Sequence, residues 1–158
     1  MSNEQDTPVL RIRDLKKTFR DFWRRPTVEA VRGLSLEVRR GEVFGLLGPS
    51  GSGKSTTIKL VLGLLHPSAG RIAIFEQPPG AMGVRRRIGY LPEVSYLHRF
   101  LTPVETLHYY AALCGLDRAT TRERTGELLR MVDLEQAADR PVGEFSKGMS
   151  RRVGLAQA

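Results

Sequence analysis

A glycine-rich segment in the first half of the chain carries the residue types and spacing that bind phosphate. It matches the pattern GxxxxGK[ST] at every position, and one threonine follows it: Gly48, Pro49, Ser50, Gly51, Ser52, Gly53, Lys54, Ser55 and Thr56. Glycines permit positive φ and expose successive N–H groups, so the backbone can wrap a β-phosphate. Lys54 adds positive charge toward the β- and γ-phosphates, and the Ser55 hydroxyl is suited to Mg²⁺. The segment predicts a nucleoside triphosphate site, with ATP and Mg²⁺ as cofactors.

The pattern is informative only where the loop joins a strand to a helix. Residues 42–47 form a short apolar run bounded by turn residues, which predicts a strand covered on both faces in a parallel sheet. From residue 55 to 65, apolar residues recur at helical spacing, and His66-Pro67 ends the predicted helix. This order favours phosphate binding over the alternative, an ordinary turn before a buried helix.

Further elements are predicted on both sides of this unit. Alternating apolar and charged residues predict strands at 9–15 and 28–38, with the aromatic and arginine-rich stretch 19–26 as a loop between them. Short apolar runs predict strands at 71–75 and 88–91.

Beyond these strands the pattern becomes helical. A short helix is expected around residues 82–87, and helical spacing extends over 103–132. Thr102 is a predicted N-cap, followed by Pro103 and by Glu105 in the first turn. We therefore predict a helical subdomain in the second half of the chain.

The composition is that of an ordinary globular chain. Its 158 residues are 41% hydrophobic and 27% charged, enough for one compact domain. No apolar run approaches the roughly 18 residues that a membrane span requires. The polar opening lacks the pattern of a secretory signal. These observations predict a cytoplasmic location.

The distribution of charge and the single cysteine limit which partners and metals the chain is expected to bind. The formal charge is +8, but the basic residues are scattered, and their one dense cluster at 85–87 lacks the interleaved aromatics of a nucleic-acid platform. We therefore expect no nucleic acid partner. Cys114 is the single cysteine, which excludes an internal disulfide and a multi-cysteine metal site and predicts a core position. His66, His98 and His108 show no metal-ligand spacing.

The phosphate loop alone does not identify the protein class. It serves GTPases, small-molecule kinases, helicases and transport ATPases alike. The chain contains no Asn-Lys-x-Asp guanine reader, which disfavours GTP. The stretch 30–48, which leads into the loop, resembles the entry to the core of the nucleotide-binding domain of ATP-binding cassette (ABC) transporters.

A second segment strengthens this resemblance. Residues 145–152 read Phe-Ser-Lys-Gly-Met-Ser-Arg-Arg and occupy the place of the family signature LSGGQ. Ser146 and Gly148 keep the serine and second glycine, whereas Phe145, Lys147 and Met149 are variants. The resemblance implies that Ser146 and Gly148 grip a γ-phosphate bound to a second nucleotide-binding domain in a head-to-tail dimer. The alternative is an ordinary helix N-cap at Ser146.

The resemblance assigns two further residues. Residues 88–93 are similar to the strand that leads to the family's Q-loop, and Glu93 stands where a glutamine normally touches Mg²⁺. The resemblance thereby implies that Glu93 is a metal-binding residue and, in addition to Lys54, a catalytic one. Phe19 occupies the place of the aromatic that stacks on adenine, with Phe22 and Trp23 as alternatives and a packing role equally open.

The family resemblance implies an α/β fold, namely a P-loop NTPase core with an antiparallel β subdomain and a helical subdomain. Within one ABC ATP-binding domain over 1–158, we expect the core and β subdomain at about 1–93 and the helical subdomain at about 94–144. The signature motif and its helix follow at 145–158. The sequence has no apolar run ending in the paired acids that the family uses around Mg²⁺ and the attacking water. We therefore expect a truncated chain, with the C-terminal part of the core missing.

The implied function is that of an ATP-binding subunit of an ABC transporter, coupling Mg-ATP hydrolysis to transport. Its partners would be a second nucleotide-binding domain and transmembrane permease subunits, which hold it at the inner face of the cell membrane. The aromatic loop and the variant signature favour export. The alternative is a truncated nucleotide-binding module without hydrolysis of its own. A family member acting on DNA or ribosomes is disfavoured because tandem cassettes are absent.

Overall fold

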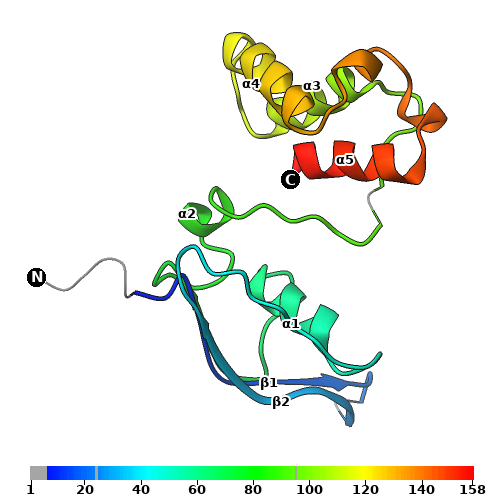
Figure 1. Ribbon diagram of the computed structural model, residues 1–158. Helices are drawn as coiled ribbons and strands as arrows, with labels where there is room; N and C mark the ends of the chain where they lie inside the picture. The colour runs from blue at the N-terminus through cyan, green and yellow to red at the C-terminus, as the bar shows by residue number, and fades with distance from the viewer. Residues whose placement is uncertain (1–6, 24, 95) are drawn as a thin grey trace, which may run out of the picture. The chain divides into compact units, whose positions relative to one another are not determined.

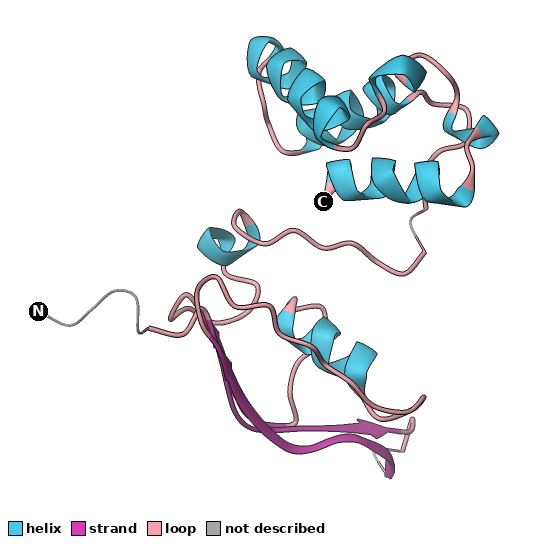
Figure 2. Ribbon diagram, in the orientation of Figure 1, coloured by secondary structure: helices cyan, strands magenta, loops and turns pink. Residues whose placement is uncertain are grey.

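The computed structural model describes residues 7–23, 25–94 and 96–158. The chain divides into two compact units, with the boundary between Ile88 and Gly89. The first unit contains the strands β1 to β3 and the helices α1 and α2, and the second contains α3, α4 and α5 (Figures 1 and 2). The phosphate loop therefore belongs to the first unit and the signature segment to the second.

An antiparallel sheet forms one layer of the first unit. Its strands are β1 (Leu10–Arg20), β2 (Pro26–Val38) and β3 (Ala69–Ile74), in the spatial order β2-β1-β3. Both pairings of the central strand β1 are antiparallel. This arrangement confirms the predicted antiparallel β subdomain, and β3 confirms the strand expected at 71–75.

The hairpin of β1 and β2 is longer than the sequence pattern indicates. The predicted loop at 19–26 is wrong at both ends, since Phe19 pairs with Val28 and Arg20 pairs with Pro26. The pairing is interrupted by register shifts, one of them between Phe19 and Arg20. Cross-strand pairing extended the strands through residues whose own propensities favour a loop.

Two of the predicted strands are absent from the described residues. Residues 42–47 and 88–91 form no strand there. Val43 is 100% exposed and Leu47 is 90% exposed, so the first run is not covered on both faces as predicted. A strand exists only through hydrogen bonds to a neighbour. Among the described residues no other strand pairs with either segment, and the local apolar pattern alone does not provide one.

Helix α1 (Lys54–Val61) begins directly after the phosphate loop, as predicted, and ends before residue 65. Gly63 follows the helix at φ 70°, and a side chain there would meet the backbone of Gly80. The short helix α2 (Met82–Arg85) confirms the one expected around residues 82–87.

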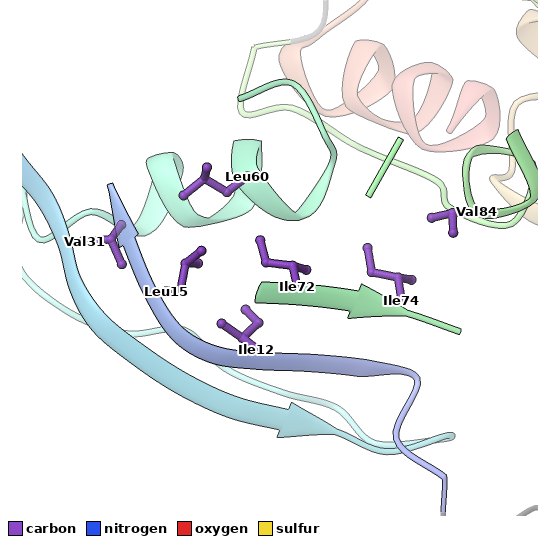
Figure 3. Packing of buried hydrophobic residues seen from close by; sticks show 7 residues of the cluster. All are labelled: Ile12, Leu15, Val31, Leu60, Ile72, Ile74 and Val84. Atoms are coloured by element: carbon purple, nitrogen blue, oxygen red, sulfur yellow. The ribbon is translucent and has the colours of Figure 1, made fainter. Parts of the chain in front are cut away.

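The core of the first unit joins this helix to the sheet. Leu60 of α1 is fully buried and points toward the sheet residues, as the close view in Figure 3 shows. The buried cluster consists of Ile12, Leu15, Val31, Leu60, Ile72, Ile74 and Val84. Burial of apolar surface therefore fixes the position of α1, and with it the phosphate loop, against β1 and β2.

The second unit is helical, as predicted for that half of the chain. Its helices are α3 (Pro103–Leu113), α4 (Arg118–Met131) and α5 (Lys147–Gln157). The short 3-10 turns η2 (Glu135–Ala137) and η3 (Val142–Glu144) lie between α4 and α5. Their shared core comprises Leu107, Leu129, Val132, Leu134, Val142, Val153 and Ala156.

Side chains cap the first two of these helices. The predicted N-cap Thr102 is confirmed: its Oγ1 accepts from the Glu105 amide at 3.2 Å, and Glu105 Oε2 accepts from the Thr102 amide at 2.8 Å. Asp117 caps α4 and accepts from the amides of Ala119 at 2.9 Å and Thr120 at 3.0 Å. These bonds satisfy helix N–H groups that have no partner within the helix.

Cys114 is exposed, which corrects the prediction of a core position. It is the C-cap residue of α3, and a helix end faces solvent more readily than the middle of an apolar face. Among the described residues, no helix is both long and apolar enough to span a membrane.

Candidate functional site

The lysine of the phosphate loop folds back over the loop itself. Lys54 Nζ donates to the carbonyl oxygens of Gly48 and Pro49, each at 2.7 Å, and to Ser52 Oγ at 3.3 Å. The ammonium group is therefore held within the curve of the backbone that precedes α1. This geometry concentrates positive charge at the place where the sequence predicts phosphate.

A glycine brings the loop close to strand β2. Gly53 is the N-cap residue of α1 and has φ 88°, a left-handed conformation that favours glycine. A Cβ at this position would collide with the carbonyl oxygen of Ala30 and lie 3.6 Å from Val31 Cγ2. Gly51 also has positive φ, at 80°, but no atom lies within 4 Å of the corresponding Cβ position. Gly53 is thus required both by its backbone angle and by its contact with β2.

The N-terminus of α1 lacks the capping found at the helices of the second unit. No side chain caps it, and its first turn contains no acidic residue. The first N–H groups of a helix carry partial positive charge and bind anions readily. Ser55 is exposed in this turn, whereas Thr57, two residues later, is buried. The helix therefore presents its amides and the Ser55 hydroxyl beside the Lys54 ammonium.

A cavity of about 510 Å³ adjoins this helix start. Residues 29–34 of β2 line one part of it, and Leu46, Leu47, Gly51, Ser52, Lys54 and Thr57 line the rest. Its volume falls in the range of small-molecule sites. Thr57 lies outside the predicted series of site residues. A threonine within an apolar helix gave no signal that would have identified it.

Carboxylates are sparse at this cavity. Glu29 is the one acidic residue among those that line it, and its Oε2 lies 3.6 Å from Arg32 Nε. The described residues contain no group of three or more His, Cys, Asp and Glu side chains able to hold a metal. Oxygen ligands for Mg²⁺ would therefore come from the phosphates themselves and from the hydroxyl of Ser55, which lies in the first turn of α1 and does not itself line the cavity.

The predicted adenine-stacking residues do not line this cavity. Phe19 lies on β1 with 39% of its surface exposed, and Lys17 Nζ approaches its ring centroid to 5.2 Å. Phe22 and Trp23 lie in the turn between β1 and β2. The assignment of an adenine-stacking aromatic stays a prediction.

The signature residues open helix α5. Ser146 is its N-cap, and Ser146 Oγ accepts from the Met149 amide at 3.2 Å. The N-cap that the sequence offered as an alternative is therefore present. A hydroxyl that accepts one hydrogen bond can still donate its own proton. Gly148 is exposed in the first turn, and the nearest atom to a Cβ built there is Ser146 Oγ at 3.8 Å.

Glu93 is held by its backbone and not by its carboxylate. One guanidinium nitrogen of Arg151 donates to the carbonyl oxygen of Pro92 and, at 2.8 Å, to that of Glu93. At the other end of this stretch, a Cβ built on Gly89 would lie 2.5 Å from the carbonyl oxygen of Ala158. Residues 92–93 are therefore hydrogen-bonded to α5, and Gly89 lies close to the residue that follows that helix. Arg151 was not predicted as a functional residue, because the residues that it joins are far apart along the chain.

Arg152 fastens the same helix on another side. Its NH1 donates to the carbonyl oxygens of Val132 at 3.0 Å and Asp133 at 2.9 Å, and also to Asp133 Oδ2 at 3.2 Å. These carbonyls lie at the C-terminal end of α4, where a cation is favourable. Adjacent arginines of α5 thus hold two different segments of the second unit.

The carboxyl group that caps α4 has a lowered pKa. The backbone amide of Thr120, followed by its hydroxyl, donates to Asp117 and lowers the pKa of that carboxyl. Hydrogen bonds to the charged form favour it. Asp117 therefore stays ionised while it caps α4.

The residues of the first unit fit a nucleoside triphosphate with its metal. The loop supplies positive φ at Gly51 and Gly53, an ammonium group from Lys54, and a helix start without a side-chain cap. Each of these features attracts phosphate oxygens. The structure brings residues 48–56 together in this unit, while Glu93, Ser146 and Gly148 belong to the second.

Comparison with known proteins gives one consistent result. The model of the family described as ABC transporter matches residues 31–158. An uncharacterized ABC transporter ATP-binding protein from Nostoc sp. is 42% identical, and the match covers 98% of this chain and 47% of that protein. The Nod factor export ATP-binding protein I from Ralstonia nicotianae is also 42% identical, over 96% of this chain and 46% of that protein. The chain spans about half the length of these curated relatives.

Solved structures agree with this result. The ATP binding subunit of an ABC transporter is 34% identical with a TM-score of 0.77, covering 95% of this chain and 61% of that one. The protein cbiO1 from Clostridium perfringens, part of the ABC transporter complex cbiONQ, is 28% identical with a TM-score of 0.83, covering 96% and 61%. The fold class expected from the sequence, that of a P-loop NTPase with an antiparallel sheet and helices, is confirmed.

Proposed function

The chain belongs to the ABC transporter family, and from this premise we propose that it binds Mg-ATP at residues 48–56 and hydrolyses it to drive transport across a membrane. The observation that carries the proposal is the position of Lys54. Its ammonium group lies inside the loop, at the start of a helix that no side chain caps. Helix N-termini with a lysine beside them are suited to phosphate.

In this proposal Lys54 exchanges partners when a nucleotide enters. Its ammonium group leaves the carbonyl oxygens of Gly48 and Pro49 and binds oxygens of the β- and γ-phosphates. The first amides of α1 donate to the β-phosphate, and Ser55 would hold Mg²⁺ through its hydroxyl. Bound Mg²⁺ would supply neutralisation of the phosphate charge. The protein contributes by positioning and by fixed positive charge.

The second unit has its role in a dimer. We assign Ser146 and the Gly148 backbone to the γ-phosphate of a nucleotide on a second nucleotide-binding domain, arranged head to tail. The Ser146 hydroxyl accepts one hydrogen bond and can still donate its own, and the first turn of α5 is exposed. Both features support this role. Glu93 would approach the metal through its carboxylate, which is exposed.

Export is the favoured direction of transport. The similarity to a Nod factor export ATP-binding protein supports it. Transmembrane permease subunits are the proposed partners, since the similar cbiO1 is part of a transporter complex. In such an assembly the chain would lie at the cytoplasmic face of the membrane, held there by the permease subunits.

A second candidate function is nucleotide binding without turnover. It is favoured by the scarcity of carboxylates at the cavity, where Glu29 alone is acidic and already lies near Arg32. Hydrolysis requires a group that orients or deprotonates the attacking water. The two candidates share one binding site and differ only in the chemical step.

One experiment tests the site and separates these candidates. Mg-ATP binding by the chain is measured by calorimetry, and phosphate release is measured on the same sample. We expect Lys54→Ala to weaken binding by about 100-fold, because a charge-assisted contact to phosphate is lost. Lys59→Ala, an exposed lysine of the same helix, is the matched control and should bind normally. Equal binding by both variants would contradict the proposed site, and binding without phosphate release would favour the second candidate.

A further inference from the structure

The tip of the hairpin formed by β1 and β2 exposes two large aromatic side chains. Phe22 is 92% exposed and Trp23 is 73% exposed. Their rings contact each other edge to face, with centroids 5.6 Å apart and planes at 89°. The pair therefore forms a small apolar surface that no other described residue covers.

Hydrogen bonds link Asp21 and Arg25, which lie on either side of these rings in the sequence. The Asp21 amide donates to the Arg25 carbonyl at 3.0 Å, and the Arg25 amide donates to Asp21 Oδ1 at 2.7 Å. In the adjoining ribbon, the paired residues Phe19 and Val28 are also exposed, by 39% and 56%. The rings thus lie between two residues that hydrogen-bond across the end of a two-stranded ribbon.

Two arginines flank the apolar tip. Arg20 ends β1 and Arg25 lies at the end of the turn, and both are exposed. Asp21, the acidic residue of the turn, already accepts from the Arg25 backbone. Aromatic rings flanked by arginine match the interface of a bilayer, where rings enter the headgroup layer and cations bind lipid phosphates.

We propose that this hairpin tip binds the surface of a membrane containing anionic phospholipid. Phe22 and Trp23 enter the headgroup region, while Arg20 and Arg25 contact the negatively charged lipids. The tip residues do not line the cavity beside Lys54, so this contact is separate from the phosphate loop. The inference goes beyond transport driven by ATP and does not depend on it. It gives the chain a lipid contact of its own.

The chain contains one tryptophan, so its fluorescence reports on the tip directly. The full chain is titrated with vesicles of phosphatidylglycerol and phosphatidylcholine, and separately with vesicles of phosphatidylcholine alone. We expect a blue shift of the Trp23 emission with the anionic vesicles only. Raising the salt to 0.5 M should reverse much of it, since salt screens the charges. Phe22→Ala should weaken vesicle binding by about tenfold because less apolar area is buried.

Control variants distinguish binding by the hairpin tip from nonspecific adsorption of the chain to vesicles. Phe100→Ala removes a ring that is 76% exposed in the second unit, and vesicle binding should stay unchanged. Arg25→Glu should weaken binding to anionic vesicles while circular dichroism shows an intact fold. An unchanged Trp23 emission with anionic vesicles would overturn the proposal. So would a shift that Mg-ATP alone produces, which would assign the ring to adenine, or one that follows protein concentration without lipid, which would indicate self-association.

Discussion

Helices α1 and α5 both carry residues that the sequence assigns to phosphate, yet they begin in opposite ways. Helix α1 starts after Gly53, with no side-chain cap. Helix α5 starts at Ser146, whose hydroxyl already accepts from the Met149 amide. The first helix start is open to an anion, whereas the second is partly satisfied by its own side chain.

The two helix starts therefore differ in how far they are preorganised for a phosphate ligand. At α1 the backbone conformation, the contact with β2 and the Lys54 ammonium are all in place. At α5 the cap stabilises the helix, and only the proton of the Ser146 hydroxyl and the exposed first turn remain to donate. The first site is therefore expected to bind nucleotide within one chain. The second is expected to contribute only when a nucleotide is presented by a partner.

Among the variants that test this comparison, Gly53→Ala should have the largest effect on stability and on ATP binding. The new Cβ would collide with the Ala30 carbonyl and would require a left-handed alanine. We expect a loss of unfolding free energy of about 3 kcal/mol, measured by urea denaturation, together with loss of ATP binding. Gly51→Ala is the matched control, because it shares the positive φ but has open space around it. Its cost should be only about 1 kcal/mol; similar costs for both would show that the contact with β2 is unimportant.

A smaller effect is expected from Ser146→Ala at the start of α5. Loss of the cap should lower the unfolding free energy by about 1 kcal/mol, measured by thermal melting followed by circular dichroism. ATP binding to the single chain should not change, since this site acts on a partner's nucleotide. Ser150→Ala, inside the same helix, should leave stability nearly unchanged. A loss of ATP affinity in the Ser146 variant would remove the distinction between the two helices.

The smallest effect concerns the charge of the α4 cap. Hydrogen bonds from Thr120 lower the pKa of Asp117 in the folded chain, so its charged form stabilises the helix above the pKa of the unfolded state. This stability should disappear as the pH falls below about 4, through the lowered pKa. Asp117→Asn and Asp117→Ser keep a capping oxygen that does not titrate in this range. Helix content followed against pH should fall less steeply in both variants; an unchanged slope would exclude Asp117 as the cause.

Features that depend on nearby residues could be predicted from the sequence. The capping box of Thr102 and Glu105 needs only residues within one turn, and the structure confirms the Thr102 cap. The phosphate loop is similar, because positive φ at Gly51 and Gly53 and the start of α1 follow from one short pattern. The hydrogen-bond partners in such elements lie within a few residues of each other in the sequence.

Features that depend on distant residues could not be predicted in this way. The apolar run 42–47 has strand character but no strand beside it among the described residues, so Val43 and Leu47 are exposed. The hairpin extends to Arg20 because Pro26 pairs with it across the turn. Cys114 is exposed because it ends a helix, which its residue type does not reveal. In each case the outcome depends on a neighbour or a position that residue composition does not encode.

The attachment of residues 92–93 to α5 has a mechanical consequence. Arg151 of α5 donates to the carbonyl oxygens of Pro92 and Glu93. The backbone that carries the Glu93 carboxylate is therefore tied to the same helix that begins at Ser146. A displacement of Arg151 with α5 would pull on the backbone of Glu93 through these two hydrogen bonds.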